Sequence, residues 1–263
     1  MMRSTTSAKV IKGVAVFAFW IAVWQLIAMI VGTELLVPSP LSVLKAIISE
    51  IGSEKFRLSV LLSLLRVLGG FAAAVVTGAV LGFLTAFVPL LNTLLSPLLK
   101  AVRAAPVASF IILALVWIKT DLLPAFISFL MGVPIVWEAV RDSAEKTDGE
   151  LLEAARVFHF SRGKTFLLVT FPAVFPSLVS SAVTCLGFCW KSGIAAEVIC
   201  LPKYSIGKGL YTAKQHLETE YVFAYTAVTV LLSIVIELLL RKIIARRRKS
   251  AKSEGGAKNG NRA

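Results

Sequence analysis

Long apolar stretches without any charged side chain dominate this sequence, and short polar segments separate them. Helices that cross a lipid bilayer typically have this length and hydropathy, whereas the strands and helices of a soluble core are shorter or amphipathic. The uncharged stretches cover residues 14–31, 67–99, 104–118, 122–137, 165–190 and 221–236.

If each stretch forms one helix, the chain crosses the membrane six times. The third and fourth uncharged cores hold 15 and 16 residues. At roughly 1.5 Å per residue, each is about 24 Å long and therefore shorter than a hydrocarbon layer of roughly 30 Å. The flanking Arg103, Lys119 and Asp121 must then reach for the interface, or the bilayer must thin. We expect spans at about 12–31, 64–88, 104–119, 122–140, 172–196 and 221–241.

The predicted fold class is therefore all-α, a polytopic integral membrane protein with about six transmembrane helices. We expect one transmembrane domain over residues 1–263 with its core at about 60–245, and a basic, disordered tail at 246–263. The basic N-terminus before an apolar run resembles a signal peptide. We expect a first span instead, because the run is longer than a typical signal core and no small-x-small cleavage site follows it.

Composition and charge exclude a soluble or disordered protein and suggest an orientation. Of the 263 residues, 57% are hydrophobic and 16% are charged. Nine of the 28 Lys and Arg residues lie beyond residue 240, where a basic tail after an apolar span marks the cytoplasmic side and attracts anionic lipids. With six spans, nineteen basic residues fall on the side of the termini and seven on the other side. We therefore expect both termini in the cytoplasm and no nucleic-acid partner.

Residues that could carry chemistry are few. Cys185, Cys189 and Cys200 lie in or beside one apolar segment, without the spacing of a metal site or a disulfide framework. Small packing side chains explain them better than a metal or redox pair. The only histidines are His159 and His216, and no nucleophile or carboxylate pattern is present. We expect no catalytic residue, no cofactor, no metal and no enzyme activity.

Two further patterns concern packing. Small residues recur every four positions within the second predicted span, and such a ladder lets another helix approach closely. Apolar residues recur at helical spacing after Pro40, which predicts an amphipathic helix on the outer surface. The ladder consists of Gly70, Ala74, Gly78 and Gly82. The apolar face of the helix after Pro40 consists of Leu41, Leu44, Ile47, Ile48 and Ile51.

The only sizeable polar stretch inside the chain is residues 141–171. Thr147 and Glu150 stand three apart as a possible capping box. We expect a short helix over residues 150–160, a turn at Ser161–Thr165 and a second helix before Pro172, all lying against the inner membrane face.

Here a resemblance to a known family becomes specific. The segment EAARVFHFSRGKTFLLVTFP resembles the EAA loop of permease subunits of bacterial ABC importers. Glu153, Ala154 and Ala155 match the start of that motif, and Pro172 matches its end. His159 stands where the family has glycine. The segments VPSPLSVL, LLSLLRVLGGFAAAVVTGAVLG and WKSGIAAEVI extend the likeness over about residues 35–248, toward the branch that imports aliphatic sulfonates, taurine or nitrate.

The resemblance implies a site and a set of partners. In this family the EAA loop is a coupling helix that inserts into a cytoplasmic ATPase. The family also implies two ATPase copies, an extracytoplasmic solute-binding protein, a second permease copy and the lipids of the bacterial inner membrane. Gly163, Lys164 and Thr165 resemble the end of a phosphate-binding loop but lack its first glycine, so the ATPase is expected to be a separate polypeptide. The candidate coupling residues are Glu153, Ala154, Ala155, Phe158, His159 and Arg162.

The glycine position of the motif allows two interpretations of His159. A glycine there permits a left-handed turn, which histidine adopts only at some cost. Either the helix runs one turn further in this chain, or His159 contacts the ATPase. We expect the longer helix.

Two ionisable residues of the fifth predicted span are candidates for the translocation pathway. Lys191 and Glu197 are six residues apart, about 240° around a helix, and do not simply pair with each other. Ionisable groups in a span are costly unless they face a partner or water. Either they line the pathway, with Lys191 attracting an anionic solute, or they satisfy packing at the interface.

The function predicted from the sequence is that of the membrane-spanning permease of an ATP-driven ABC importer. The expected solute is a sulfonate, taurine or a nitrate-like anion. A vitamin precursor, such as a thiamine pyrimidine or riboflavin, is an alternative solute. An ion-driven secondary transporter is the alternative of another class.

Overall fold

The computed structural model describes residues 4–260, with the surroundings of side chains given for residues 11–246. Every element in this part of the chain is a helix, which confirms the expected all-α class. In chain order the elements are α1 Ser4–Val31, α2 Pro40–Ile51, α3 Glu54–Phe87, α4 Pro89–Ala104, α5 Val107–Ala114, α6 Leu123–Glu145, α7 Gly149–Val157, α8 Arg162–Thr165, the π-helix η1 Phe166–Thr170, α9 Phe171–Cys200, α10 Ile206–Gln215 and α11 Thr219–Gly260.

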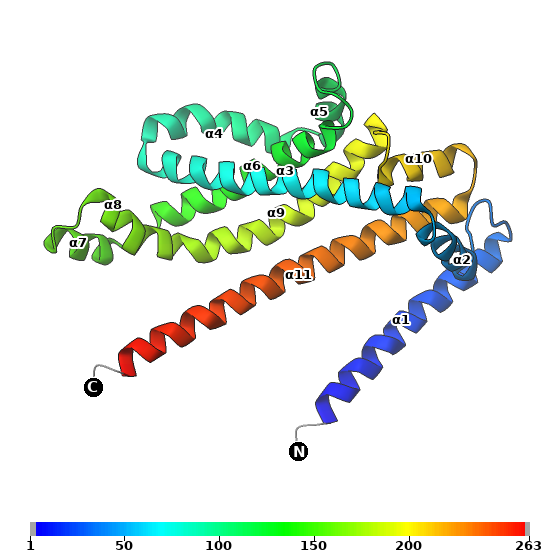
Figure 1. Ribbon diagram of the computed structural model, residues 1–263, viewed down its shortest axis with the longest axis horizontal. Helices are drawn as coiled ribbons and strands as arrows, with labels where there is room; N and C mark the ends of the chain where they lie inside the picture. The colour runs from blue at the N-terminus through cyan, green and yellow to red at the C-terminus, as the bar shows by residue number, and fades with distance from the viewer. Residues whose placement is uncertain (1–3, 261–263) are drawn as a thin grey trace.

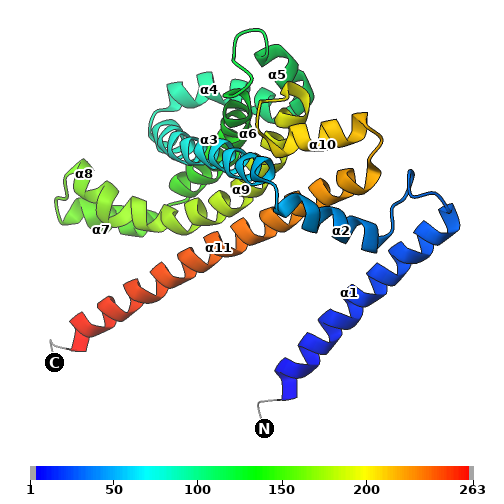
Figure 2. The ribbon, with the colours of Figure 1, turned by 45° about the vertical axis from the view of Figure 1, so that its right-hand side comes forward.

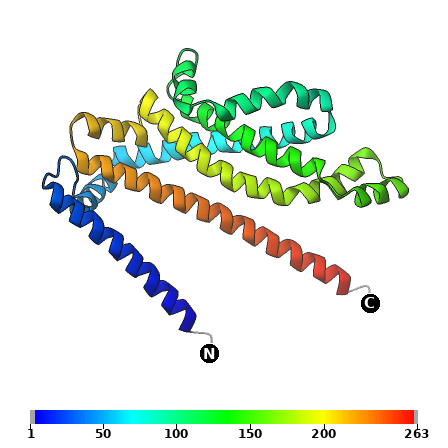
Figure 3. The ribbon, with the colours of Figure 1, turned by 180° about the vertical axis from the view of Figure 1, so that it is seen from behind.

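Three long helices, α3, α6 and α9, pack along one another and form the core, and α11 runs beside α9 (Figure 1). Helices α2 and α10 lie at one end of this bundle, which we call the α10 end. Helices α7 and α8 lie at the other, which we call the α7 end (Figure 2). Helix α1 contacts α2 and diverges from the bundle, and both α1 and α11 extend away from the α10 end (Figure 3).

Five of these helical segments are long and apolar enough to cross a membrane, and a sixth crossing is made if the bent pair α4 and α5 counts as one span. The number agrees with the expected six, but the third span differs. Residues 104–119 do not form one straight helix, because α4 and α5 meet at 103° around Ala105 and Pro106. Proline disfavours helical geometry in the residue before it and removes an amide donor.

A second proline explains how the long apolar run 67–99 is divided. Val88 leaves the helical region with φ −123° and ψ 95°, and Pro89 begins a new helix that returns along the bundle. Lys100 and Arg103 consequently lie on α4, not in a connection between spans as expected. The predicted span at about 64–88 ends where α3 ends, but the sequence analysis assigned no helix to the rest of the run, because hydropathy is continuous across the turn.

The ends of other spans also differ from the sequence prediction. The fifth span begins well before residue 172, because α8, η1 and α9 follow one another from Arg162 to Cys200. Helix α11 continues to Gly260, where a disordered tail was expected from residue 246. Residues 261–263 lie outside the described part of the chain.

The small-residue ladder of α3 faces α6 as expected. All four of its members are buried. A Cβ added to Gly78 would lie 2.8 Å from Cβ of Val136, and one added to Gly82 would lie 2.7 Å from Cβ of Val140. Real Cβ atoms are not found this close, so the two backbones approach only because the side chains are absent. Trp137 of α6 fills the neighbouring space and donates from Nε1 to Oγ1 of Thr85 at 2.9 Å.

Helix α2 has the amphipathic form that was expected. Ser39 caps its N-terminus by accepting from the Ser42 amide, and Pro40 occupies the first turn. Val43 and Ala46 face the protein. The larger apolar residues Leu41, Leu44, Ile48 and Ile51 are exposed.

Cys185 and Cys189 lie buried on one face of α9, with their sulfur atoms 3.6 Å apart. A Cβ added to Gly132 of α6 would lie 2.8 Å and 2.9 Å from the two sulfurs. The thiols therefore fill the space that this glycine leaves. Across residues 11–246, no group of three or more His, Cys, Asp or Glu side chains is placed to hold a metal ion.

Candidate functional site

The polar segment singled out in the sequence forms the tip of the α7 end. Helix α7 begins after Asp148, whose side chain accepts from the Glu150 amide at 2.9 Å. Asp148 is therefore the N-cap, and the capping box proposed for Thr147 and Glu150 does not form. Asp148 caps the helix because its carboxylate reaches the free amides of the first turn and interacts favourably with the positive end of the helix dipole.

Helix α7 ends at Val157, and His159 adopts the left-handed conformation with φ 53°. The His159 amide donates to the Arg156 carbonyl and the Phe160 amide to the Ala155 carbonyl, both at 2.9 Å. This pair of bonds is a Schellman motif, which satisfies carbonyls that the helix end leaves open. The expectation that the helix runs one turn further is wrong. His159 takes the conformation that glycine takes easily, and Ser161 starts α8 directly afterwards.

The candidate coupling residues do not all share one environment. Phe158 is 73% exposed, and Glu153, Ala154, His159 and Arg162 are exposed as well. Ala155 is instead buried, so its side chain packs inside the protein and its carbonyl takes part in the Schellman motif. Helix α7 and its C-cap thus present a small surface with the carboxylates of Glu150 and Glu153 and the exposed ring of Phe158, the composition expected of a contact with a partner protein.

A cluster of phenylalanines connects this tip to the core, and the sequence analysis did not predict it. Phe166 of η1 lies edge-on to Phe83 and Phe87 near the end of α3, with ring centroids 5.0 Å and 6.2 Å apart. Phe171 at the start of α9 lies 6.2 Å from Phe166 and 6.3 Å from Phe83. The spacing of Phe83 and Phe87 by four residues was the available signal. The interlocked rings join η1, which directly follows α8, to the end of α3 and the start of α9.

Glu197, one of the two pathway candidates, lies at the α10 end with an exposure of 0%. Its Oε2 accepts from Ser63 Oγ at 2.7 Å and from the Gly207 amide at 3.2 Å. Ser63 Oγ in turn accepts from the Ile206 amide at 3.0 Å. The carboxylate therefore joins α9 to α3 and to the start of α10.

Arg66 of α3 completes this buried network. One guanidinium nitrogen lies 3.6 Å from Glu197 Oε1 and donates to the Tyr204 carbonyl at 2.7 Å. The other donates to Asp121 at 3.2 Å. The sequence analysis overlooked Arg66, although an arginine in the second predicted span and a glutamate directly after the fifth are a signal of pairing. Lys191 is exposed and lies apart from this network, and its role in a pathway stays a prediction.

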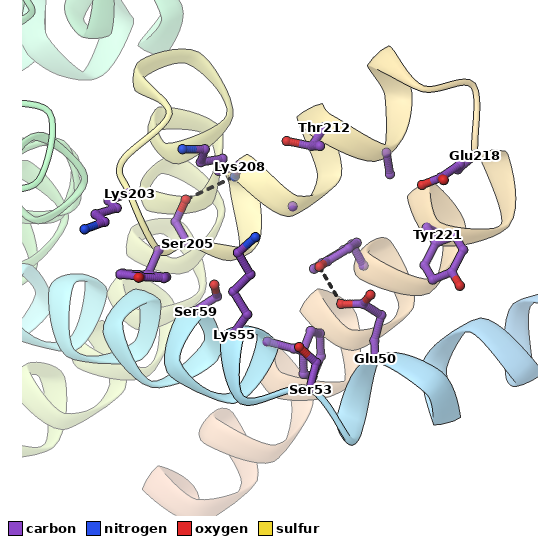
Figure 4. A pocket seen from close by; sticks show the side chains of 15 residues that line it. Glu50, Ser53, Lys55, Ser59, Lys203, Ser205, Lys208, Thr212, Glu218 and Tyr221 are labelled. Atoms are coloured by element: carbon purple, nitrogen blue, oxygen red, sulfur yellow. Dashed lines mark hydrogen bonds between the residues drawn. The ribbon is translucent and has the colours of Figure 1, made fainter.

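A cavity of about 430 Å³ opens at the α10 end between α3, α10 and α11, beside the end of α2 (Figure 4). Three lysines, two glutamates, three tyrosines and several further hydroxyl groups make up most of its wall. Its polar lining residues are Glu50, Ser53, Lys55, Ser59, Lys203, Tyr204, Ser205, Lys208, Thr212, Glu218, Tyr221 and Tyr225. None of these residues was proposed as a site from the sequence, because they come from three separate stretches of the chain, 50–59, 203–213 and 218–225.

An all-helical bundle with five or six potential spans and a protruding α7 tip is the architecture of a polytopic membrane protein. Residues 74–249 match the family of binding-protein-dependent transport system inner membrane components, and the chain belongs to this family. The assignment to ABC importer permeases, made from the EAA-like loop, is confirmed.

The relatives place the chain among permeases of the expected branch. It is 27% identical to the nitrate import permease protein NrtB of Synechocystis, over 91% of this chain and 88% of that protein. It is 23% identical to the taurine transport system permease protein TauC of Escherichia coli, over 92% and 90%. A solved structure of an amino acid ABC transporter with histidines shares the fold, with a TM-score of 0.53 and 16% identity over 71% of this chain and 91% of that one. Members of the family are membrane transport components and not enzymes.

Proposed function

We propose that this chain forms the translocation path of an ATP-driven importer for a small anionic or zwitterionic solute, and that the α7 tip transmits the motion of a separate ATPase. The observation that carries the coupling role is the exposed surface of α7 around Glu153 and Phe158. This surface is joined to α3 and α9 by interlocked aromatic rings.

Membership of the family implies ATPase and binding-protein partners in general. We infer the finer assembly: two permease copies form the path, two ATPase copies bind the α7 tips, and membrane lipids cover the apolar spans. In this arrangement Glu153 pairs with a basic residue of the ATPase, and Phe158 fills an apolar pocket beside it. A binding protein then delivers the solute at the opposite end.

The same proposal places the α7 end and both termini in the cytoplasm of a bacterial inner membrane. Basic residues gather in the α7–α8 segment and beyond residue 240, where the positive-inside rule retains them. This bias remains when Lys100 and Arg103, which lie on α4, are left out of the count. The α10 end with its cavity then faces the outside of the cell.

The names of the relatives support an anionic or zwitterionic solute. They are permeases for nitrate, for taurine and, at 30% identity over 58% of this chain and 55% of that protein, for bicarbonate in Synechococcus elongatus. Each of these solutes carries an anionic group. We therefore propose this chemical class, and not one particular compound, as the cargo.

Copurification of the permease with its ATPase tests the coupling site. Replacing Phe158 by alanine removes the bare ring from α7 and is expected to weaken the complex on the order of tenfold, as loss of a central aromatic contact does. Leu217→Ala is the control, because Leu217 is also an exposed apolar residue but lies at the α10 end. An unchanged complex in Phe158→Ala would contradict the proposed site.

Transport in proteoliposomes tests the importer assignment itself. Uptake is expected to require the ATPase subunits and ATP. Uptake by the permease alone, which persists without ATP and collapses with an ion gradient, would identify a secondary transporter instead.

A further inference from the structure

We propose that the cavity at the α10 end is a binding site for a small zwitterionic solute, one that carries an acidic group and an ammonium group on a short backbone. This inference rests on the proposed function only for the view that the ligand is the transported solute. The site itself follows from the cavity, its charges and the contacts that fix its walls.

The cavity has the size of a small-molecule site. Its volume of about 430 Å³ falls within the range of roughly 300–1,000 Å³ that is usual for such sites. Phe56 and the tyrosine rings supply apolar surface, and Ser59 and Thr212 supply hydroxyl groups on opposite sides. Specific sites combine these features, in which apolar walls hold the body of a ligand and a few polar groups orient it.

The charges of the cavity are separated along its length. Lys55, Lys203 and Lys208 lie around Ser205, where α10 begins, whereas Glu50 and Glu218 lie nearer the start of α11 (Figure 4). The ammonium groups fit a sulfonate or carboxylate, and the carboxylates fit an amine. A plain anion would satisfy the lysines and leave the carboxylates of Glu50 and Glu218 without a cation. A solute with both charges complements the whole cavity.

The basic part of the cavity is held in place from behind. The Gly207 amide binds Glu197, and a Cβ on Gly207 would lie 2.4 Å from Cβ of Glu197. Arg66 holds the Tyr204 carbonyl at 2.7 Å. Ser205 accepts from the Lys208 amide and caps α10. The buried network therefore fixes the backbone that carries Lys203 and Lys208, and such support gives a site its geometry before the ligand arrives.

The acidic part is held by a different contact. Tyr225 of α11 donates its hydroxyl to Glu50 Oε2 at 2.7 Å. Its ring lies over Gly209, where a Cβ would come within 2.4 Å of it. Glycines at positions 207 and 209 thus let the first turn of α10 approach α9 on one side and α11 on the other. Because α10 is held against α9 and α11, the cavity lies between α10 and the start of α3.

Equilibrium binding to the full-length permease in lipid nanodiscs tests the proposal without ATP or ATPase. The probes are taurine, which carries a sulfonate and an ammonium group, and ethanesulfonate, which lacks the ammonium group. We expect wild-type protein to bind taurine on the order of tenfold more tightly than ethanesulfonate, as one charge-assisted contact provides. Equal binding of the two, or no binding of either, would overturn the zwitterion site.

Matched variants locate the binding. Lys208→Ala and Lys55→Gln are each expected to weaken taurine binding on the order of tenfold, whereas Lys214→Ala, an exposed lysine of the same helix outside the cavity wall, should leave it unchanged. Glu218→Gln should remove the preference for taurine over ethanesulfonate, and Glu220→Gln should keep it. Unchanged binding in Lys208→Ala and Lys55→Gln would show that the ligand lies elsewhere.

The outcomes separate this site from the importer assignment. A chain that transports with its ATPase but binds taurine identically in all cavity variants would overturn the site alone. A chain that binds taurine as described but assembles with no ATPase would overturn the proposed function and keep the site.

Discussion

His159 takes a backbone conformation that costs a side-chain-bearing residue roughly 1–2 kcal/mol. Replacing it by glycine should remove part of that cost and stabilise the end of α7 by about 1 kcal/mol. His159→Val, whose branched side chain fits this conformation poorly, should loosen it. Hydrogen exchange of the Phe160 amide measures the effect, because this amide closes the Schellman motif. Exchange is expected to slow about fivefold in the glycine variant. Identical exchange in both variants would contradict the reasoning.

The buried pair of Arg66 and Glu197 leads to a second prediction at the residue scale. Glu197→Met leaves the Arg66 guanidinium with only the exposed Asp121 as a carboxylate partner, and Arg66→Met leaves the buried Glu197 carboxylate without its cation. Each should lower the free energy of unfolding by about 3–5 kcal/mol. The double variant should cost clearly less than the sum, because neither charge is then left alone.

Denaturant unfolding in detergent provides the measurement for this cycle. Asp121→Asn is the control, since the Asp121 side chain is 64% exposed and its ion pair with Arg66 should contribute at most about 1 kcal/mol. Additive costs of the two methionine substitutions would show that the pair does not act as a unit.

Among the helices, the contact between α3 and α6 depends on the absence of side chains at chosen positions. Gly69 and Gly70 are neighbours on α3, but a Cβ on Gly70 would lie 2.2 Å from the Ala125 carbonyl oxygen and one on Gly69 would meet nothing within 4 Å. Gly70→Ala should therefore destabilise the protein by about 1–3 kcal/mol. Gly69→Ala should be neutral or stabilise it by up to about 1 kcal/mol, since alanine favours the helix. Thermal unfolding of the Gly69→Ala and Gly70→Ala variants distinguishes overpacking against α6 from a general effect of replacing glycine by alanine.

The aromatic junction between η1, α3 and α9 gives a prediction about coupling. Phe166→Leu keeps an apolar side chain but removes three ring contacts. We expect the ATPase to bind as before, whereas solute moved per ATP hydrolysed should fall by about tenfold, given roughly 0.5–1.5 kcal/mol for each aromatic pair. Phe175→Leu is the matched control, because its ring contacts only Phe171 among the described aromatic pairs. Loss of ATPase binding in Phe166→Leu would assign the junction to assembly instead.

For the whole molecule, the direction of insertion can be measured with single cysteines. The variants Lys164→Cys and Lys214→Cys place the cysteine on α8 and on α10, which lie at opposite ends of the bundle. In intact cells a membrane-impermeant thiol reagent should label position 214 readily and position 164 only after the membrane is opened. The native cysteines are buried and should give little background. Labelling of position 164 from outside would contradict the proposed orientation.

Hydropathy and one short motif determined the class of this protein. Long uncharged runs are stable only out of water, and the polar segment with the EAA pattern marks the family to which the chain belongs. Both are properties of consecutive residues. The spans therefore could be expected from the sequence, apart from the third, where hydropathy does not register the turns at Pro89 and Pro106.

Only the tertiary structure decided which distant residues meet. The cavity draws its lysines from α3, α10 and the connection before α10, and the Arg66 network draws on four parts of the chain. Local sequence patterns do not predict these long-range contacts, because the contacts depend on how closely the backbones approach one another at Gly70, Gly207 and Gly209. The conformation of His159, by contrast, was decided locally, by the carbonyls of Ala155 and Arg156 at the end of α7 that required partners.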